Sequence, residues 1–289
     1  MITHPFTYQA PATIEEAVQQ LGKGGDAKVI AGGHSLLPLM KLGLAQPETL
    51  VDLRRIASLR EIRTDPDGTI VIGALATHRD IAHNEIVRAK LAALAEAAGE
   101  IGDLQVRARG TMGGSLAHAD SAADEPAPTL AYDATIRAIG PRGRRDIAAR
   151  DYFKGTFETA LAENEIIAEI RFPAPAGRTG GAYAKFAHPA SGFAVTGVAA
   201  VVTIKSDGSI ERAAVGVSGV AAAAYRATAA EKALTGSKGD AKAIADAAAK
   251  AADGITALSD LAASADYRKH LATVYAKRAI QRAIDRARA

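Results

Sequence analysis

Apolar residues recur every three or four positions, or in short runs, along most of the chain, which predicts a mixture of helices and strands. The first helix is expected to begin at Thr13, whose hydroxyl stands three residues before the carboxylate of Glu16, the spacing of a capping box. We expect it to end at Gly22. Its apolar stripe consists of Ile14, Ala17, Val18 and Leu21.

Further short elements follow by the same reasoning. A second helix is expected to start near Ser35, Thr77 is expected to cap a third, and residues 85–98 are expected to form one longer helix. The predicted buried strands are 28–31, 50–53 and 69–73. The segments do not alternate as they do in a doubly wound sheet or a barrel, so the predicted fold class is α+β.

A break in composition at residues 173–181, with two prolines and three glycines in nine residues, indicates a linker or a long turn. We therefore predict two domains, 1–177 and 178–289. The second is expected to contain a strand at 210–220 and to be helical from Arg226 onward.

Composition narrows the class of protein. Apolar residues make up 48% and charged residues 23% of the 289, a normal globular balance. Nucleic-acid binding is disfavoured because the net charge is only +3, tryptophan is absent and aromatics total 4%. The start lacks the pattern of a secretory signal, and no apolar stretch approaches the length of a membrane span. A cytoplasmic location is expected.

The chain has no cysteine. It can therefore form no disulfide, thiolate-bound zinc site, cysteine-ligated iron–sulfur cluster or cysteine nucleophile. Redox chemistry would need an organic cofactor or a partner chain.

The first candidate for chemistry is the segment 29–38, in which a predicted strand runs into Gly32, Gly33 and a helix start. Glycines let the backbone approach a ligand closely, and unpaired N–H groups suit a phosphate. The segment matches neither the G-x-G-x-x-G dinucleotide fingerprint nor the G-x-x-x-x-G-K-[ST] phosphate loop. Taken alone, the segment is slightly better explained as a structural turn between a strand and a helix than as a phosphate-binding loop.

The second candidate is the segment 109–126, which again places two glycines, Gly113 and Gly114, beside the hydroxyl residues Thr111 and Ser115. Two such loops are more informative than one, because a diphosphate that joins two moieties needs donors from several directions. The potential ligands His118, Asp120, Asp124 and Glu125 lack a known metal-site spacing, and we interpret them as ordinary turn and capping residues.

Together these segments resemble the two flavin loops of the FAD-binding medium subunit of the aerobic carbon monoxide dehydrogenase and xanthine dehydrogenase (molybdenum hydroxylase) family. Three later blocks match in order: 152–156, 164–173 and 266–272. The resemblance implies a vanillyl-alcohol-oxidase (PCMH)-type FAD-binding domain. A small C-terminal domain with a three-stranded antiparallel sheet and helices would follow it.

Carried over position by position, the resemblance assigns cofactor contacts but no catalytic residue and no metal ligand. The loops would hold the pyrophosphate and the flavin, with the N–H groups of both loops offsetting the diphosphate charge. Asp124 would accept hydrogen bonds from ribityl hydroxyls, and Lys185 would stabilise negative charge on a phosphate or on reduced flavin. The assigned residues are Ala31, Gly32, Gly33, His34, Ser35, Ile101, Thr111, Met112, Gly113, Gly114, Ser115, Asp124, Ile167 and Lys185.

Three positions depart from the family pattern. Met112 replaces an isoleucine or valine, Ser115 stands where asparagine is common, and Glu125 adds a charge where an apolar residue is usual. No aromatic residue is assigned to cover the flavin ring; the candidates are Tyr152, Phe186 and Phe193.

The resemblance implies an electron-transfer subunit. A large subunit with a molybdopterin-type molybdenum cofactor would oxidise the substrate, and [2Fe–2S] clusters in a small subunit would pass electrons to FAD in this chain, within a dimer of heterotrimers. The substrate and the external acceptor are left open, as is peripheral association with the inner membrane through that acceptor. The alternatives are a stand-alone flavin oxidase or dehydrogenase and a non-enzymatic nucleotide-binding protein.

Overall fold

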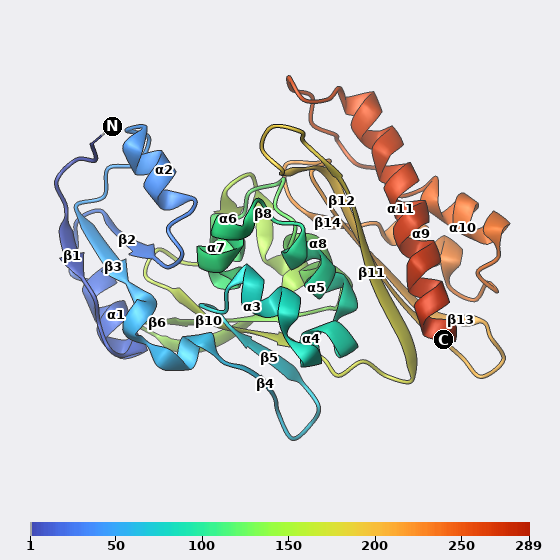
Figure 1. Cartoon of the computed structure of the whole chain (residues 1–289), viewed down its shortest axis with the longest axis horizontal. Coiled ribbons are helices and arrows are strands. Elements are labelled where there is room, and N and C mark those ends of the chain that lie inside the picture. The colour runs from blue at the N-terminus through green and yellow to red at the C-terminus, as the bar shows by residue number, and fades with distance from the viewer. Residues whose placement is uncertain (1) are drawn as a thin grey trace.

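Three sheets lie side by side along the chain in the computed structural model, which describes residues 2–289 (Figure 1). The first sheet is parallel, in the order β1-β3-β2. Its elements are β1 (Thr7–Gln9), α1 (Ile14–Leu21), β2 (Ala27–Ile30), α2 (Leu36–Lys41) and β3 (Thr49–Asp52).

The second sheet is antiparallel, in the order β4-β5-β10-β6-β7, and a layer of short helices lies beside it (Figure 1). Its strands are β4 (Ile62–Thr64), β5 (Ile70–Gly73), β6 (Thr135–Gly140), β7 (Gly143–Ala148) and β10 (Ile166–Phe172). The helices are α3 (His78–His83), α4 (Glu85–Lys90), α5 (Ala92–Gly99), α6 (Leu104–Arg109), α7 (Met112–His118) and α8 (Pro126–Ala131). A separate hairpin consists of β8 (Phe153–Gly155) and β9 (Glu158–Thr159), and three 3-10 turns span Leu53–Arg55, Ala57–Arg60 and Ala149–Asp151.

The third sheet is antiparallel and contains three long strands with a two-residue fourth at its edge. The strands are β11 (Arg178–Ala187), β12 (Ala194–Ile204), β13 (Ile210–Ser218) and β14 (Tyr225–Arg226). The helices α9 (Thr228–Leu234), α10 (Ala241–Ala248) and α11 (Ala265–Arg288) follow, and α11 lies along β11 and β12 (Figure 1). The three long strands confirm the predicted antiparallel sheet.

Every residue of β12 is buried, because this strand is covered on both faces. Strand side chains point alternately to opposite faces. Val198, Ala200 and Val202 join the core under α9–α11, whereas Ala199 and Val201 join the core that α5 and α8 form with the second sheet. The third sheet is thus a layer shared by two cores, which explains why β12 carries apolar residues on both of its faces rather than on alternate positions alone.

The elements expected from the apolar pattern are present, with three corrections. The helix expected at 85–98 is two helices, because Leu91 leaves helical geometry at φ −128° and ψ 48°. Residues 249–264, expected to be helical, form turns and loops. Glu16 accepts from the N–H of Ala12 rather than that of Thr13, so the expected capping box is incomplete there, whereas Thr77 and Asp80 form a complete one.

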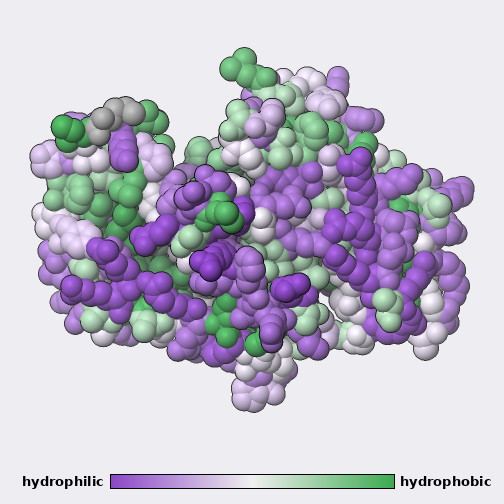
Figure 2. Space-filling view, in the orientation of Figure 1, coloured by the Kyte–Doolittle hydropathy of each residue, from purple (hydrophilic) through white to green (hydrophobic). Residues whose placement is uncertain are grey.

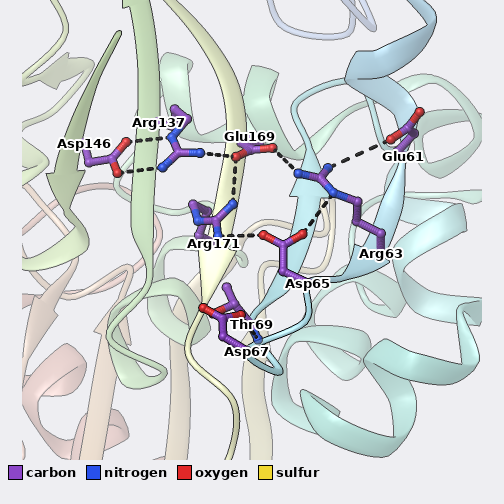
Figure 3. A network of polar contacts seen from close by, with 9 residues as sticks. All are labelled: Glu61, Arg63, Asp65, Asp67, Thr69, Arg137, Asp146, Glu169 and Arg171. Atoms are coloured by element: carbon purple, nitrogen blue, oxygen red, sulfur yellow. Dashed lines mark hydrogen bonds and ion pairs between the residues drawn. The ribbon is translucent and has the colours of Figure 1, made fainter.

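An ion-pair network covers one face of the second sheet, centred on Glu169 of β10 (Figure 3). Its carboxylate accepts from Arg63 on β4 at 2.9 Å, from Arg137 on β6 at 2.7 Å and from Arg171 at 3.0 Å. One acid thereby links strands on both sides of β10, and it is only slightly exposed.

Glu169→Gln is expected to destabilise the chain by about 1.5–3 kcal/mol, because charge-assisted hydrogen bonds are lost and three guanidinium groups remain close together. Burial acts to raise the pKa of Glu169, but the hydrogen bonds from Arg63 and Arg171 prevail and hold it below its usual value. Its contribution is therefore complete above the unfolded pKa of about 4.3 and is lost as the pH falls through the folded pKa.

Thermal unfolding midpoints across the acid range check this prediction. Glu211→Gln, an exposed carboxylate on β13, is the matched control and should leave the midpoint unchanged. Equal midpoints for Glu169→Gln and the wild type near neutral pH would contradict the structural role of the network.

Candidate functional site

A cavity of about 950 Å³ is lined by segments from the first sheet, the helix layer and the loop before β12. This volume is at the upper end of the range for cofactor sites. In the space-filling view a recess separates the part that carries α2 from the central helices (Figure 2). Twelve of the fourteen residues assigned by resemblance line the cavity: Ala31, Gly32, Gly33, His34, Ser35, Ile101, Thr111, Gly113, Gly114, Ser115, Asp124 and Ile167.

The two glycine loops, distant in sequence, lie against each other. A Cβ added to Gly32 would lie 2.8 Å from the Cα of Gly110 and would collide with the carbonyl oxygen of Arg109. Gly33 adopts φ +77°, a conformation that L side chains rarely take. Glycine is therefore required in the first loop by close packing at one position and by backbone conformation at the next.

The backbone N–H groups of the two loops differ in availability. Within residues 2–289, those from Gly32 to Ser35 donate to no acceptor, which leaves four successive donors at the cavity. Each N–H from Met112 to Ser115 is already used. Their acceptors are the carbonyl oxygens of Ala76, Ala74 and Thr111 and the hydroxyl of Thr111. The expectation that both loops offer their N–H groups equally to a diphosphate is therefore corrected. Within the described residues the second loop leaves only the N–H of Thr111 without an acceptor, whereas the first loop leaves four successive N–H groups.

Asp124 is the acid at the centre of a buried cluster. Its carboxylate lies 2.9 Å from the Nζ of Lys185 and accepts from the hydroxyl of Tyr183 at 2.6 Å. Lys185 also donates to the carbonyl oxygen of Glu100, and its side chain is only 1% exposed. Burial raises the pKa of Asp124, and the Lys185 charge and the Tyr183 hydrogen bond act against that rise. Lys185 therefore holds Asp124 in place and is not itself among the residues that line the cavity.

A second buried pair consists of His78 and Glu125. The Nδ1 atom of His78 lies 2.8 Å from Oε1 of Glu125, whose side chain is 0% exposed. His78 lines the cavity, although nothing in its sequence surroundings distinguished it. Burial disfavours the charged form of His78, but the charge and hydrogen bond of Glu125 prevail and raise its pKa.

Met112 is the other assigned residue that does not line the cavity. Its side chain is fully buried in the core of the second sheet, and glycine is needed next to it because a Cβ on Gly113 would lie 2.5 Å from that of Ala74. The His34 ring turns back on its own loop, where its Nδ1 lies 3.0 Å from the carbonyl oxygen of Gly32.

Of the three aromatic candidates, only Phe193 lines the cavity. Tyr152 is fully buried in the core, and Phe186 packs against Tyr267 and Tyr275. Phe157, which the sequence did not single out, also lines the cavity. It is 58% exposed and has φ +59°, and its ring lies against that of His118 in a tilted arrangement with centroids 4.8 Å apart. No periodic pattern identifies an aromatic in such a turn.

The part of the chain that the structure describes contains neither a group of metal-ligand side chains nor a membrane-spanning helix. There, no three His, Asp or Glu side chains are grouped as metal ligands, and His118, Asp120, Asp124 and Glu125 make separate contacts. No helix of residues 2–289 is long and apolar enough to cross a membrane.

The arrangement suits a large anionic ligand with polar and apolar parts. Four free N–H groups can bind a phosphate, and Asp124, which also lines the cavity, adds an acceptor. Aliphatic side chains such as Ile101 and Ile167 line other parts.

Comparison with known proteins agrees with this chemistry. Residues 4–175 match the model of the FAD binding domain in molybdopterin dehydrogenase, and residues 181–283 match that of the CO dehydrogenase flavoprotein C-terminal domain. The chain belongs to the family of molybdopterin dehydrogenase FAD-binding proteins.

Similar proteins cover almost the whole chain. The carbon monoxide dehydrogenase medium chain of Hydrogenophaga pseudoflava is 44% identical over 98% of both chains. The 6-hydroxypseudooxynicotine dehydrogenase complex subunit alpha of Paenarthrobacter nicotinovorans is 36% identical over 98% of this chain and 96% of its own. A solved structure of the Hydrogenophaga pseudoflava carbon monoxide dehydrogenase, in a form that lacks the Mo-pyranopterin moiety of the molybdenum cofactor, matches 99% of both chains with a TM-score of 0.94 and 45% identity.

Proposed function

We propose that this chain is the FAD-binding electron-transfer subunit of a molybdenum hydroxylase. The observation that carries the proposal is the set of four free N–H groups in a cavity of about 950 Å³, in a chain of the molybdopterin dehydrogenase flavoprotein family. The chain is an oxidoreductase subunit like its relatives.

The residues present fit FAD. The N–H groups of Gly32–Ser35 would bind the diphosphate, and Asp124 would accept hydrogen bonds from the ribityl hydroxyls. Ile101 and Ile167 would exclude water from the flavin, while Lys185 would act through Asp124. FAD, when bound, supplies the capacity to accept and release electrons.

The electron donor would be another polypeptide, because a chain without cysteine cannot hold a cysteine-ligated cluster. We infer a small subunit with [2Fe–2S] clusters and a large subunit with a molybdopterin-type molybdenum cofactor, assembled as a dimer of heterotrimers in the cytoplasm. We also propose a boundary between the two domains at residue 177. Relatives named for carbon monoxide and for 6-hydroxypseudooxynicotine share the fold, so this chain does not by itself set the substrate.

The visible spectrum of the purified full chain tests the flavin assignment. We expect two flavin bands and the release of FAD on denaturation. If neither is found, even after incubation with FAD, the proposal fails. Copurification from cells that express the neighbouring genes should recover molybdenum and iron on partner chains. A catalytically complete isolated chain without either metal would instead favour a stand-alone flavin oxidase.

A further inference from the structure

We propose that His78, held by the buried carboxylate of Glu125, donates a charged hydrogen bond from Nε2 to the diphosphate of FAD. The inference rests on the proposed function, since it requires FAD in the cavity. It adds a side-chain cation to the backbone donors of the first loop.

The placement of His78 is the first argument. Its ring lies beside Gly110, because a Cβ added there would lie 2.7 Å from both Cδ2 and Nε2 of His78. Gly110 in turn contacts Gly32, the first of the four free N–H donors. The imidazole therefore lies beside the junction of the two loops and lines the same cavity.

The two ring nitrogens of His78 have different environments. Nδ1 contacts Glu125, which orients the ring, while Nε2 has no partner within residues 2–289. A carboxylate on one nitrogen fixes the other as the donor or acceptor for a ligand. Nε2 is thus left to a group inside the cavity.

Charge is the third argument. Glu125 is fully buried, its Oε2 atom accepts no hydrogen bond from the described residues, and its one ion pair there is with His78. A buried carboxylate needs a cationic partner, so it favours imidazolium. Asp124 also favours that form and Arg107 on α6 opposes it. A cation adjacent to an anion-binding loop would increase the affinity for a diphosphate.

The effect would be large enough to measure. A hydrogen bond to a charged group contributes about 1.5–3 kcal/mol, so its loss should weaken FAD binding by about 10- to 100-fold. Since the pKa of His78 is raised, the contribution is present at low pH and is lost as the pH rises through the folded value.

Four full-length proteins test the inference. They are the wild type, Glu125→Gln, the double variant His78→Gln/Glu125→Gln, and the control His83→Gln. The double variant removes both charges together and leaves no unpaired buried ion, so it should remain folded. His83 is exposed on the same helix and does not line the cavity. The dissociation constant for FAD is measured from about pH 6 to about pH 9, and the diphosphate of bound FAD is followed by phosphorus NMR.

We expect the wild type and His83→Gln to lose affinity as the pH rises, with phosphorus resonances that titrate in parallel. The double variant should bind FAD about tenfold or more weakly at low pH and should lack this titration, and Glu125→Gln should titrate at lower pH. His34 and His118, which also line the cavity, are the same in all four proteins, so they do not account for differences between them.

If the double variant matches the wild type in affinity and in its phosphorus titration, His78 does not contact the diphosphate. A loss of affinity with an unchanged phosphorus titration would also overturn the inference, since it would indicate a structural role alone. Failure of the wild type to bind FAD would instead contradict the proposed function.

Discussion

Gly114→Val is expected to purify without FAD while remaining folded. Gly114 lines the cavity, and a Cβ added there meets only the Thr111 hydroxyl within 4 Å, at 2.9 Å. The valine methyl groups would therefore occupy ligand space rather than protein core. Overpacking costs about 1–3 kcal/mol, so FAD affinity should fall by up to about 100-fold.

Equilibrium titration with FAD, with a thermal unfolding midpoint for each protein, checks this prediction. Gly99→Val, at an exposed position at the end of α5, controls for a general glycine-to-valine effect. Gly113→Val is the contrasting variant, because its Cβ would lie 2.5 Å from Ala74 and should destabilise the fold itself. Normal FAD occupancy in folded Gly114→Val would contradict the assignment of the second loop to the cofactor.

Lys185→Met is expected to have the largest effect on stability, about 3–5 kcal/mol, because it leaves the buried carboxylate of Asp124 without its cation. Burial already raises the pKa of Asp124, and removal of Lys185 should raise it further. For a carboxyl with a raised folded pKa, stability is greatest below the unfolded pKa and falls as the pH rises through the folded value. The deficit of the variant should therefore be smallest in acid and largest near neutral pH.

Thermal midpoints as a function of pH test this, at roughly 2–4 °C per kcal/mol for chains of 150–250 residues. Lys185→Met/Asp124→Asn should recover most of the loss, since the pair is then neutral. Lys205→Met, at an exposed position, is the control and should change stability by less than about 0.5 kcal/mol. A pH-independent deficit, or no recovery in the double variant, would show that the ion pair is not its cause.

The secondary structure could be predicted where local chemistry decides it. Thr77 caps α3, and the strands expected at 28–31 and 69–73 are present with ends shifted by a residue at most. The break at Leu91 was not predictable, since both flanking segments have helical apolar spacing and the separation depends on packing around that residue.

The candidate site was predictable in its loops but not in its side-chain partners. The paired glycines marked both loops, yet periodicity cannot show that the N–H groups from Met112 to Ser115 are already bonded, two of them to Ala76 and Ala74 and two of them to Thr111 at the start of α7. His78 and Glu125 are 47 residues apart, and only the fold brings them together. From the sequence, Glu125 was interpreted as an extra charge near the second loop, and its pairing with His78 was not predicted.

The shared layer formed by β12 has a consequence for cooperativity. Alternate side chains of β12 belong to two different cores. Unfolding of either core would therefore expose apolar side chains of the other core to water. The two halves should therefore unfold as one thermodynamic unit, although the sequence marks a break between them. Ile101 precedes that break in the sequence and Ser191 follows it, yet both line the same cavity. The distance between them should therefore stay constant until the whole chain unfolds.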